Sequence, residues 1–254
     1  MAIIGAILGD IGGSRWEFCK PKDLDWEHID LFTDDCFFTD DTVLTVATKY
    51  ALQNNVSFKE AYHKFGNKYP NCSYGCGFES WLGSNNIFGN GAAMRVSPVV
   101  DLCESRLEVS YLSKESAICS HDNPEGIKGT KVTATCAWMA KRGASKKEIE
   151  EYACRKYPSD EYMFPVSMSL KELREKYRWN ETCQGSVPVA IRCFLDSKDY
   201  ESFIRNVLSL PCDTDTLCAI GGGIAEEFYH GTGFDEDKLL RRYLDDRLYK
   251  IVKA

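Results

Sequence analysis

The stretch Phe38-Thr39-Asp40-Asp41-Thr42 has a close counterpart far downstream, Asp213-Thr214-Asp215-Thr216. Each copy places two carboxylates and threonine hydroxyls just before an apolar pattern that predicts a helix. Hard oxygen ligands grouped in this way suit magnesium, manganese or calcium, and not zinc. Both stretches could instead be helix N-caps, because Thr and Asp side chains accept hydrogen bonds from free backbone N–H groups. One cap needs only one such side chain, so four carboxylates favour a metal site.

The segments around these two clusters show helical periods almost throughout. Apolar residues recur at intervals of three and four from Val43 to Ala51, as in a helix that packs against a core. Ser57 and Glu60 have the spacing of a capping box. Further helical patterns cover residues 99–117, 125–142, 189–195, 200–210, 217–229 and 238–252. Alternating strand patterns are nearly absent, so we predict an all-α fold that forms one compact domain over residues 1–254.

The apolar N-terminal stretch predicts a buried helix. Gly5 and Gly9 lie four residues apart on one face of that helix, where another backbone can approach closely. Asp10 follows at its end, and Gly12 and Gly13 are expected to break it.

Glu17 stands between two aromatic residues, Trp16 and Phe18, just beyond this helix. A lone Glu is usually a solvated surface charge, so the residue has a structural as well as a functional interpretation. Residues 19–37 show no clear period. A long irregular segment in a compact domain is more often a functional loop than filler, and we interpret it as a lid.

A glycine-punctuated stretch ends in Phe88-Gly89-Asn90-Gly91. Glycines ahead of a helix leave backbone N–H groups free to hold a phosphate. Gly-Asn-Gly is equally common as a tight turn, so both interpretations stay open from the residues alone. Downstream, His121 lies between Ser120 and Asp122, although a lone histidine is more often structural than catalytic.

Composition excludes several classes of partner. The 254 residues carry 31 Lys and Arg against 38 Asp and Glu, a net charge of −7, and no basic run stands out. Nucleic acid is therefore a poor partner. The apolar N-terminus reaches Asp10 too early to span a membrane and has no basic leader. We accordingly expect a monomeric cytoplasmic protein whose twelve cysteines are thiols, without a zinc site.

These stretches resemble the ADP-ribosylglycohydrolases, also called ADP-ribosyl hydrolases, which include the dinitrogenase reductase activating glycohydrolase. The motifs that carry the resemblance run through nearly the whole chain in this order: Gly9-Asp10 with Trp16-Glu17-Phe18, Thr39-Asp40-Asp41-Thr42, Gly89-Asn90-Gly91-Ala92-Ala93-Met94-Arg95, Ser120-His121, and Asp213-Thr214-Asp215-Thr216 with Ala219 and Gly221 to Gly223.

The resemblance implies an all-helical hydrolase that holds two Mg²⁺ ions, with Mn²⁺ possible, and releases ADP-ribose from a protein side chain or a small conjugate. The implied metal ligands are Thr39, Asp40, Asp41, Asp213, Asp215 and Thr216. The implied substrate-binding residues are Phe88, Gly89, Asn90, Gly91 and His121. Glu17 and Asp41 are the candidate catalytic carboxylates, and the sequence does not decide which of them activates water.

Two other functions fit the same residues. A metal-dependent phosphoesterase would also use paired Asp clusters and a phosphate loop. A fold can also persist as a non-catalytic ADP-ribose-binding protein after its chemistry is lost. The linkage to the acceptor (arginine, serine or a small ester) is expected to depend on the rim of the cleft, residues 19–38 and 69–86.

Overall fold

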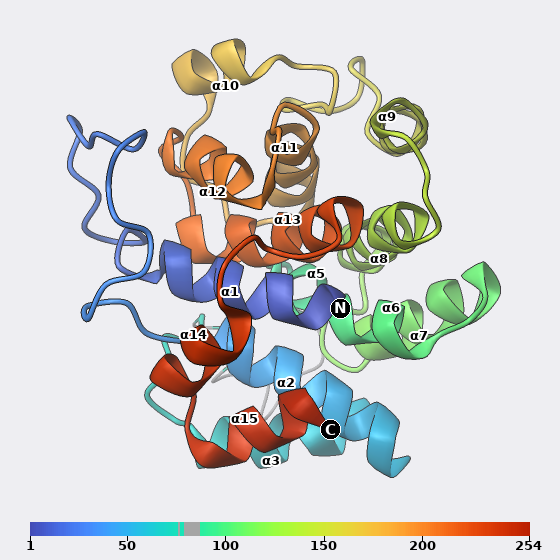
Figure 1. Cartoon of the computed structure of the whole chain (residues 1–254). Coiled ribbons are helices and arrows are strands. Elements are labelled where there is room, and N and C mark those ends of the chain that lie inside the picture. Colours follow the sequence, from blue (N-terminus) through green and yellow to red (C-terminus); the bar gives the residue numbers. More distant parts are fainter. Residues whose placement is uncertain (76, 79–86) are drawn as a thin grey trace.

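A computed structural model describes residues 1–75, 77–78 and 87–254 and is almost entirely helical (Figure 1). No β-strand occurs in these ranges, and an isolated bridge joins Gly89 to Thr182. The all-α prediction is therefore confirmed. The helices are α1 (Ala2–Ser14), α2 (Asp40–Asn54), α3 (Phe58–Lys68), α5 (Gly91–Met94), α6 (Ser97–Leu102), α7 (Arg106–Ile118), α8 (Pro124–Lys141), α9 (Lys146–Lys156), α10 (Leu170–Lys176), α11 (Cys183–Leu195), α12 (Tyr200–Leu208), α13 (Thr214–Tyr229), α14 (Glu236–Tyr243) and α15 (Asp246–Lys253).

Helices α1 and α13 lie side by side through the middle of the molecule (Figure 1). Their backbones touch because glycines line the contact. A Cβ atom on Gly5 would lie 2.3 Å from the carbonyl oxygen of Gly222, and one on Gly9 would lie 2.3 Å from that of Cys218. Real Cβ atoms do not approach backbone atoms so closely, so this face of α1 must be glycine. The predicted close approach of a second backbone is confirmed.

The prediction that Gly12 and Gly13 break the first helix is wrong. Helix α1 continues through both residues to Ser14, and every residue from Ala2 to Ser14 is buried. Glycine costs about 1 kcal/mol relative to alanine inside a helix. At Gly13 the packing against α13 offsets this cost, because a Cβ atom there would lie 2.7 Å from the backbone of Asp215.

Two acidic clusters begin α2 and α13, and they differ in how they cap their helices. Thr39 is the N-cap of α2, and its hydroxyl accepts a hydrogen bond from the N–H group of Asp41. Asp213 occupies the N-cap position of α13, but its side chain makes no capping bond. Capping therefore accounts for part of the first cluster and for none of the second.

Other helices surround the α1–α13 pair. Helices α8, α11 and α12 contact α13, while α2 and α6 contact α1 from another side. Helices α3 and α15 pack on α2, away from α13 (Figure 1). This arrangement brings the starts of α2 and α13 together near the middle of the molecule, although Asp40 and Thr214 lie 174 positions apart in the sequence.

Two predicted helices are each divided in the structure. The pattern at residues 99–117 corresponds to α6 and α7, because Ser105 forms a capping box with Glu108 and starts a new helix. The pattern at 238–252 corresponds to α14 and α15, where the Asp245 carboxylate accepts hydrogen bonds from the N–H groups of Arg247 and Leu248. A periodic pattern continues across such a break, so the caps rather than the period mark the boundary.

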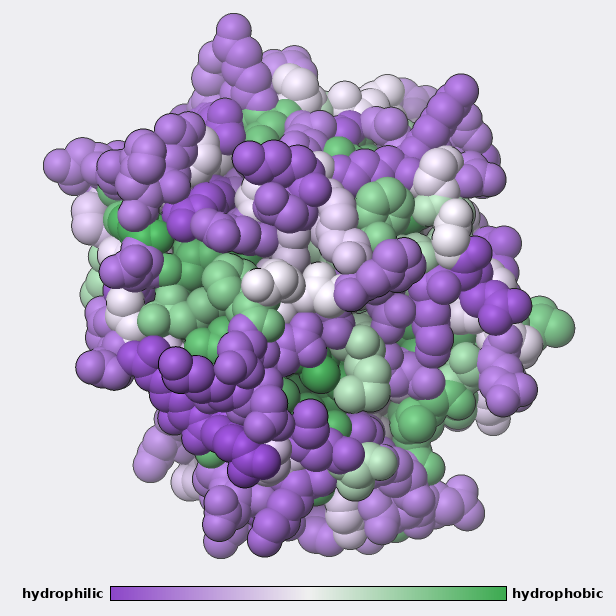
Figure 2. All heavy atoms as spheres, in the orientation of Figure 1, coloured by the Kyte–Doolittle hydropathy of each residue, from purple (hydrophilic) through white to green (hydrophobic). Residues whose placement is uncertain are grey.

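The surface seen in Figure 2 is mostly hydrophilic, and hydrophobic side chains show in patches between polar ones. Among the described residues, no helix is long and apolar enough to cross a bilayer. The cysteines in the same part of the chain form no disulfide with one another, and Cys76 lies outside it.

Candidate active site

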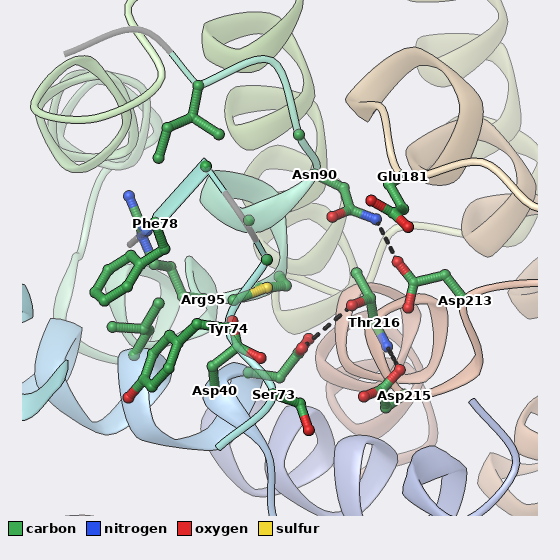
Figure 3. A pocket seen from close by; sticks show the side chains of 18 of the residues that line it. Asp40, Ser73, Tyr74, Phe78, Asn90, Arg95, Glu181, Asp213, Asp215 and Thr216 are labelled. Atoms are coloured by element: carbon green, nitrogen blue, oxygen red, sulfur yellow. Dashed lines mark hydrogen bonds between the residues drawn. The ribbon is translucent and has the colours of Figure 1, made fainter. Parts of the chain in front are cut away.

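A cavity of about 510 Å³ opens where the starts of α2 and α13 meet α5 (Figure 3). This volume lies within the range of small-molecule sites. The residues named from the sequence that line it are Glu17, Asp40, Asp41, Phe88, Gly89, Asn90, Gly91, His121, Asp213, Asp215 and Thr216. Thr39 is fully buried and is not part of the lining. The structure thus brings all but one of the expected site residues to one cavity.

Carboxylates from three segments converge at the floor of this cavity. One oxygen each from Asp10, Asp41 and Asp215 lies within 4.8 Å of the others. Oxygens of Glu17, Asp213 and Asp215 form a second such group, so Asp215 belongs to both. Two adjoining oxygen clusters that share a carboxylate can hold hard divalent cations.

Asp41 and Thr216 join the acidic stretch at the start of α2 to the one at the start of α13. The hydroxyl of Thr216 donates to Oδ2 of Asp41 over 3.1 Å (Figure 3). The other oxygen, Oδ1 of Asp41, is buried and has no hydrogen-bond partner within the described ranges. A buried carboxylate oxygen without a partner is costly, and a cation bound there would satisfy it. The residues present therefore fit a metal ion.

Asp10 holds the start of α2 in place. Its carboxylate accepts hydrogen bonds from the N–H group of Thr39 over 3.0 Å, the Thr39 hydroxyl over 2.8 Å and the Thr42 N–H group over 3.1 Å. The Thr42 hydroxyl donates to it as well. Because these bonds engage both oxygens, Asp10 positions Asp41 from beneath the cavity. The hydroxyl of Thr39 is occupied in the same network.

Burial dominates the electrostatics of the clusters. It raises the pKa of Asp41 and Asp215 well above the usual range for Asp, and repulsion from neighbouring carboxylates adds to the effect. Asp40 shows the same direction for the same reasons. The pKa of Asp10 is raised by burial to about 6, although its hydrogen bonds oppose the shift. Divalent cations would relieve both the burial cost and the repulsion.

Glu17 lies in the turn that directly follows α1, where the N–H group of Trp16 donates to the carbonyl oxygen of Gly13 over 2.9 Å. Its carboxylate groups with those of Asp213 and Asp215, although Glu17 lies about 200 positions away from them in the sequence. Burial first, and then the charge of Asp213, raise the pKa of Glu17 to about 8. A solvated surface carboxylate would not have this shift.

Asn90 links the Gly-Asn-Gly loop to the second acidic cluster. Its side-chain amide donates to Oδ2 of Asp213 over 2.9 Å and to the hydroxyl of Ser186 over 3.0 Å (Figure 3). The N–H group of Asn90 donates to the carbonyl oxygen of Glu181 over 2.7 Å. The loop and the carboxylates are therefore held in a fixed relation.

His121 lies beneath this loop. A Cβ atom on Gly91 would be 3.3 Å from Nε2 of His121, so a side chain at position 91 would press on that atom. Nδ1 is 2.8 Å from the hydroxyl of Ser120, whereas Nε2 is buried without a hydrogen-bond partner in the described structure. Burial and the charge of Arg95 hold the pKa of His121 well below its usual value, so the ring is neutral.

One end of the cavity is aromatic, a feature that the sequence did not reveal. Tyr74 and Phe78 stack with ring centroids 4.5 Å apart and planes inclined by 15°. They lie at the opposite end from Asp213 and Asp215 in Figure 3. Aromatic residues in the glycine-punctuated stretch were the available signal, but their spacing of four gives no information about what they face.

The residues that form the rim near the carboxylates were also not predicted from the sequence. Glu181 and Phe18 line the cavity, and Trp179 donates its Nε1–H to Oε1 of Glu181 over 2.8 Å. The rings of Phe18 and Trp179 have centroids 5.9 Å apart. None of residues 19–37 lines the cavity, so this structure does not support their interpretation as a lid.

The expected acceptor rim is described only in part. Residues 19–38 pack elsewhere: the guanidinium of Arg205 donates to the carbonyl oxygen of Trp26 over 2.9 Å, and the Tyr243 hydroxyl donates to that of Thr33 over 2.8 Å. In the second stretch, 69–86, residues 76 and 79–86 lie outside the described ranges. Of the described residues in that stretch, Ser73, Tyr74 and Phe78 line the cavity, together with Phe18 and Glu181 from other segments.

Similarity to known proteins identifies the class to which this fold and cavity belong. A sequence model of the ADP-ribosylglycohydrolase family matches residues 1–226. The chain therefore belongs to the ADP-ribosylglycohydrolase family, and this membership identifies it as an ADP-ribosyl hydrolase.

Individual relatives agree with this assignment. The chain is 25% identical to human ADP-ribosylhydrolase ARH3 across 89% of this chain and 84% of the relative. It is 24% identical to the zebrafish (Danio rerio) protein of the same name, across 90% and 81%. A solved structure described as an ADP-ribosylglycohydrolase-related protein complex superimposes with a TM-score of 0.75 at 21% identity, covering 98% of this chain and 93% of the other. This last likeness shows the fold.

Proposed function

We propose that the protein is a magnesium-dependent hydrolase that releases ADP-ribose from ADP-ribosylated protein side chains, arginine- or serine-linked, or from a small ADP-ribose conjugate. The observation that carries the proposal is the convergence of two carboxylate clusters and Glu17 in a cavity that also contains Asn90 and His121. Each end of that cavity suits one part of ADP-ribose.

The aromatic end suits adenine. Tyr74 and Phe78 present a stacked pair, and Phe88, 66% exposed, lies on the same loop as Asn90. Stacking of a base on an aromatic ring contributes about 1–3 kcal/mol. The pyrophosphate would then lie against the loop of residues 88–91, where Nε2 of His121 offers a donor from beneath.

The acidic end suits the ribose that carries the scissile bond. Asp40, Asp41, Asp213, Asp215 and Thr216 would hold two magnesium ions, with Thr39 contributing from below, and manganese would fit the same oxygens. When bound, magnesium supplies Lewis-acid stabilisation of developing charge and orients ribose hydroxyls and water.

Glu17 is placed to move a proton at the anomeric carbon. Cleavage there develops positive charge on the ribose, which a nearby carboxylate stabilises. The pKa of Glu17 is about 8 in the metal-free protein, and cations bound beside it would lower this pKa, which leaves a carboxylate able to take a proton from water. Asp41, whose Oδ1 faces no hydrogen-bond donor in the described structure, is the second candidate for this role.

The experiment offers four substrates to the purified protein with magnesium or with a chelator: arginine-linked and serine-linked ADP-ribosyl peptides, O-acetyl-ADP-ribose and a generic phosphate monoester. Release of free ADP-ribose that requires magnesium supports the proposal. Release of free phosphate alone would point to a phosphoesterase, and tight ADP-ribose binding without turnover would point to a binding protein.

A further inference from the structure

Arg95, Ser120 and His121 form a chain of hydrogen bonds beneath the Gly-Asn-Gly loop. Their side chains are almost completely buried, with 1%, 0% and 2% exposed. Nη2 of Arg95 donates to Oγ of Ser120 over 2.6 Å, and Oγ lies 2.8 Å from Nδ1 of His121. Two atoms of this chain are buried without a hydrogen-bond partner in the part of the molecule that is described: Nε of Arg95 at one end and Nε2 of His121 at the other.

The direction of these bonds follows from the chemistry of the first donor. A guanidinium carries five N–H donors and no acceptor, so Ser120 must accept from Arg95. The hydroxyl of Ser120 then has its own proton to donate, and Nδ1 of His121 is the imidazole acceptor within reach. A neutral imidazole has one donor and one acceptor nitrogen. If Nδ1 accepts, Nε2 carries the proton.

Arg95 is itself fixed in place. Its guanidinium carbon lies 3.9 Å from the centroid of the Tyr62 ring, and Nη2 also donates to the carbonyl oxygen of Ser116 over 3.2 Å. A cation over an aromatic face is attracted to it. The Arg95 guanidinium, which sets the direction of the hydrogen bonds, therefore cannot rotate freely.

The backbone around His121 is equally constrained. The N–H group of His121 donates to the carbonyl oxygen of Ala117 over 2.8 Å. The N–H group of Ile87, at the start of the described loop, donates to the carbonyl oxygen of Ser120 over 2.9 Å. These bonds tie the loop to the backbone of the imidazole, and Nε2 lies beneath Gly91.

We propose that Arg95 and Ser120 are positioning residues that hold His121 as the Nε2–H tautomer, so that a neutral ring presents one fixed N–H donor to a phosphate oxygen. The inference rests on the proposed function for the identity of the ligand, a pyrophosphate-containing nucleotide. It adds the reason why this donor is oriented before the ligand arrives: a preorganised donor loses little freedom on binding.

Nitrogen NMR of the parent protein tests the tautomer directly. The chain contains four histidines. Long-range ¹H–¹⁵N spectra of histidine-labelled protein, assigned with a His121→Asn variant, should show Nδ1 of His121 as the unprotonated nitrogen and Nε2 as the protonated one. A ring protonated at Nδ1 would overturn the proposal. This measurement needs no bound nucleotide, so it holds even if the proposed function fails.

Calorimetric titration with ADP-ribose and with adenosine tests the consequence. Ser120→Ala should weaken ADP-ribose binding about three- to tenfold and leave adenosine, which has no phosphate, unchanged. Ser120→Cys keeps a weaker hydrogen-bond donor, so its affinity for ADP-ribose should lie between that of the parent and that of Ser120→Ala. Ser113→Ala is the matched control: it removes another fully buried hydroxyl, on α7, and should bind both ligands like the parent.

A His121→Ala variant separates the two hypotheses. If it weakens ADP-ribose binding while Ser120→Ala behaves like the parent, the positioning role is wrong and the phosphate contact stands. If His121→Ala has no effect on ADP-ribose, the assignment of His121 to the substrate site is wrong, and the positioning role falls with it.

Discussion

Gly13 of α1 lies directly against the backbone of Asp215, the residue shared by both carboxylate clusters. A Cβ atom on Gly13 would lie 2.7 Å from Cα and from N of Asp215. Real Cβ atoms do not come so close, so any side chain here must displace α13 at its first turn. The contact between the central helices therefore sets the position of a proposed metal ligand.

Gly13→Ala should lower both stability and magnesium affinity. Overpacking at such a contact costs about 1–3 kcal/mol, and the displacement falls on Asp215. Gly12→Ala is the matched control, because its Cβ would meet Phe32 and Ile204 at 3.6–3.8 Å, an ordinary contact. It should be neutral or stabilising by up to about 1 kcal/mol. Calorimetric unfolding and magnesium titration measure both effects, and equal behaviour of the two variants would contradict the coupling.

Magnesium should stabilise the protein more at pH 8 than at pH 5.5. Burial raises the folded-state pKa of Asp10 to about 6 and that of Glu17 to about 8, from ordinary values of 3.8 and 4.5. Between about pH 4 and pH 8 the metal-free folded state therefore holds more protons than the unfolded state, so its stability falls as pH rises.

Metal binding should offset the stability that the folded protein loses as pH rises. It should also release protons, because cations replace them on the same oxygens. The measurement compares the melting temperature with and without magnesium chloride at both pH values, at matched ionic strength. Titrations in buffers of different ionisation enthalpy count the released protons. A pH-independent increase in melting temperature, or no proton release, would argue against the carboxylate clusters as the metal site.

Glu17→Gln should lower single-turnover release of ADP-ribose by about two to four powers of ten while ADP-ribose binding survives. The amide keeps the shape of the side chain but removes the charge and the basic site. Binding should tighten if the carboxylate repels the pyrophosphate. Glu151→Gln, on the exposed face of α9, is the control and should turn over normally.

The outcome for Glu17 also separates its roles. Near-normal turnover would remove Glu17 from the mechanism. A parallel fall in magnesium and ADP-ribose affinity would make it a metal ligand instead, as its grouping with Asp213 and Asp215 allows.

Glu181→Gln should reduce kcat/KM for an arginine-linked substrate about three- to tenfold and affect a serine-linked one less. Glu181 lines the acidic end of the cavity, and a guanidinium leaving group is attracted by a carboxylate and by the neighbouring Trp179 ring, whereas a serine hydroxyl is not. Glu175→Gln, at the exposed end of α10, is the control. Equal losses on both substrates would show that Glu181 acts on something other than the acceptor.

The sequence by itself determined the helical class and named most of the polar residues that line the cavity. Helical periods and capping boxes are local, because each depends on residues three or four apart, and Ser57 with Glu60 and Ser145 with Glu148 begin helices as such signals predict. The two acidic stretches were recognisable because their composition exceeds what a cap requires. Gly5 and Gly9 revealed a close helix contact, although not its partner.

The tertiary structure decided which of these residues meet, and why. Asp10 is a local helix residue until α1 lies beside α2, 29 residues away, where it organises the start of that helix through Thr39. Glu181 reaches the cavity because its carbonyl oxygen pairs with Asn90, 91 positions earlier in the chain. Glu17 joins Asp213 through the packing of α1 on α13. Contacts of this kind leave no periodic trace in the sequence, since they depend on how finished helices pack.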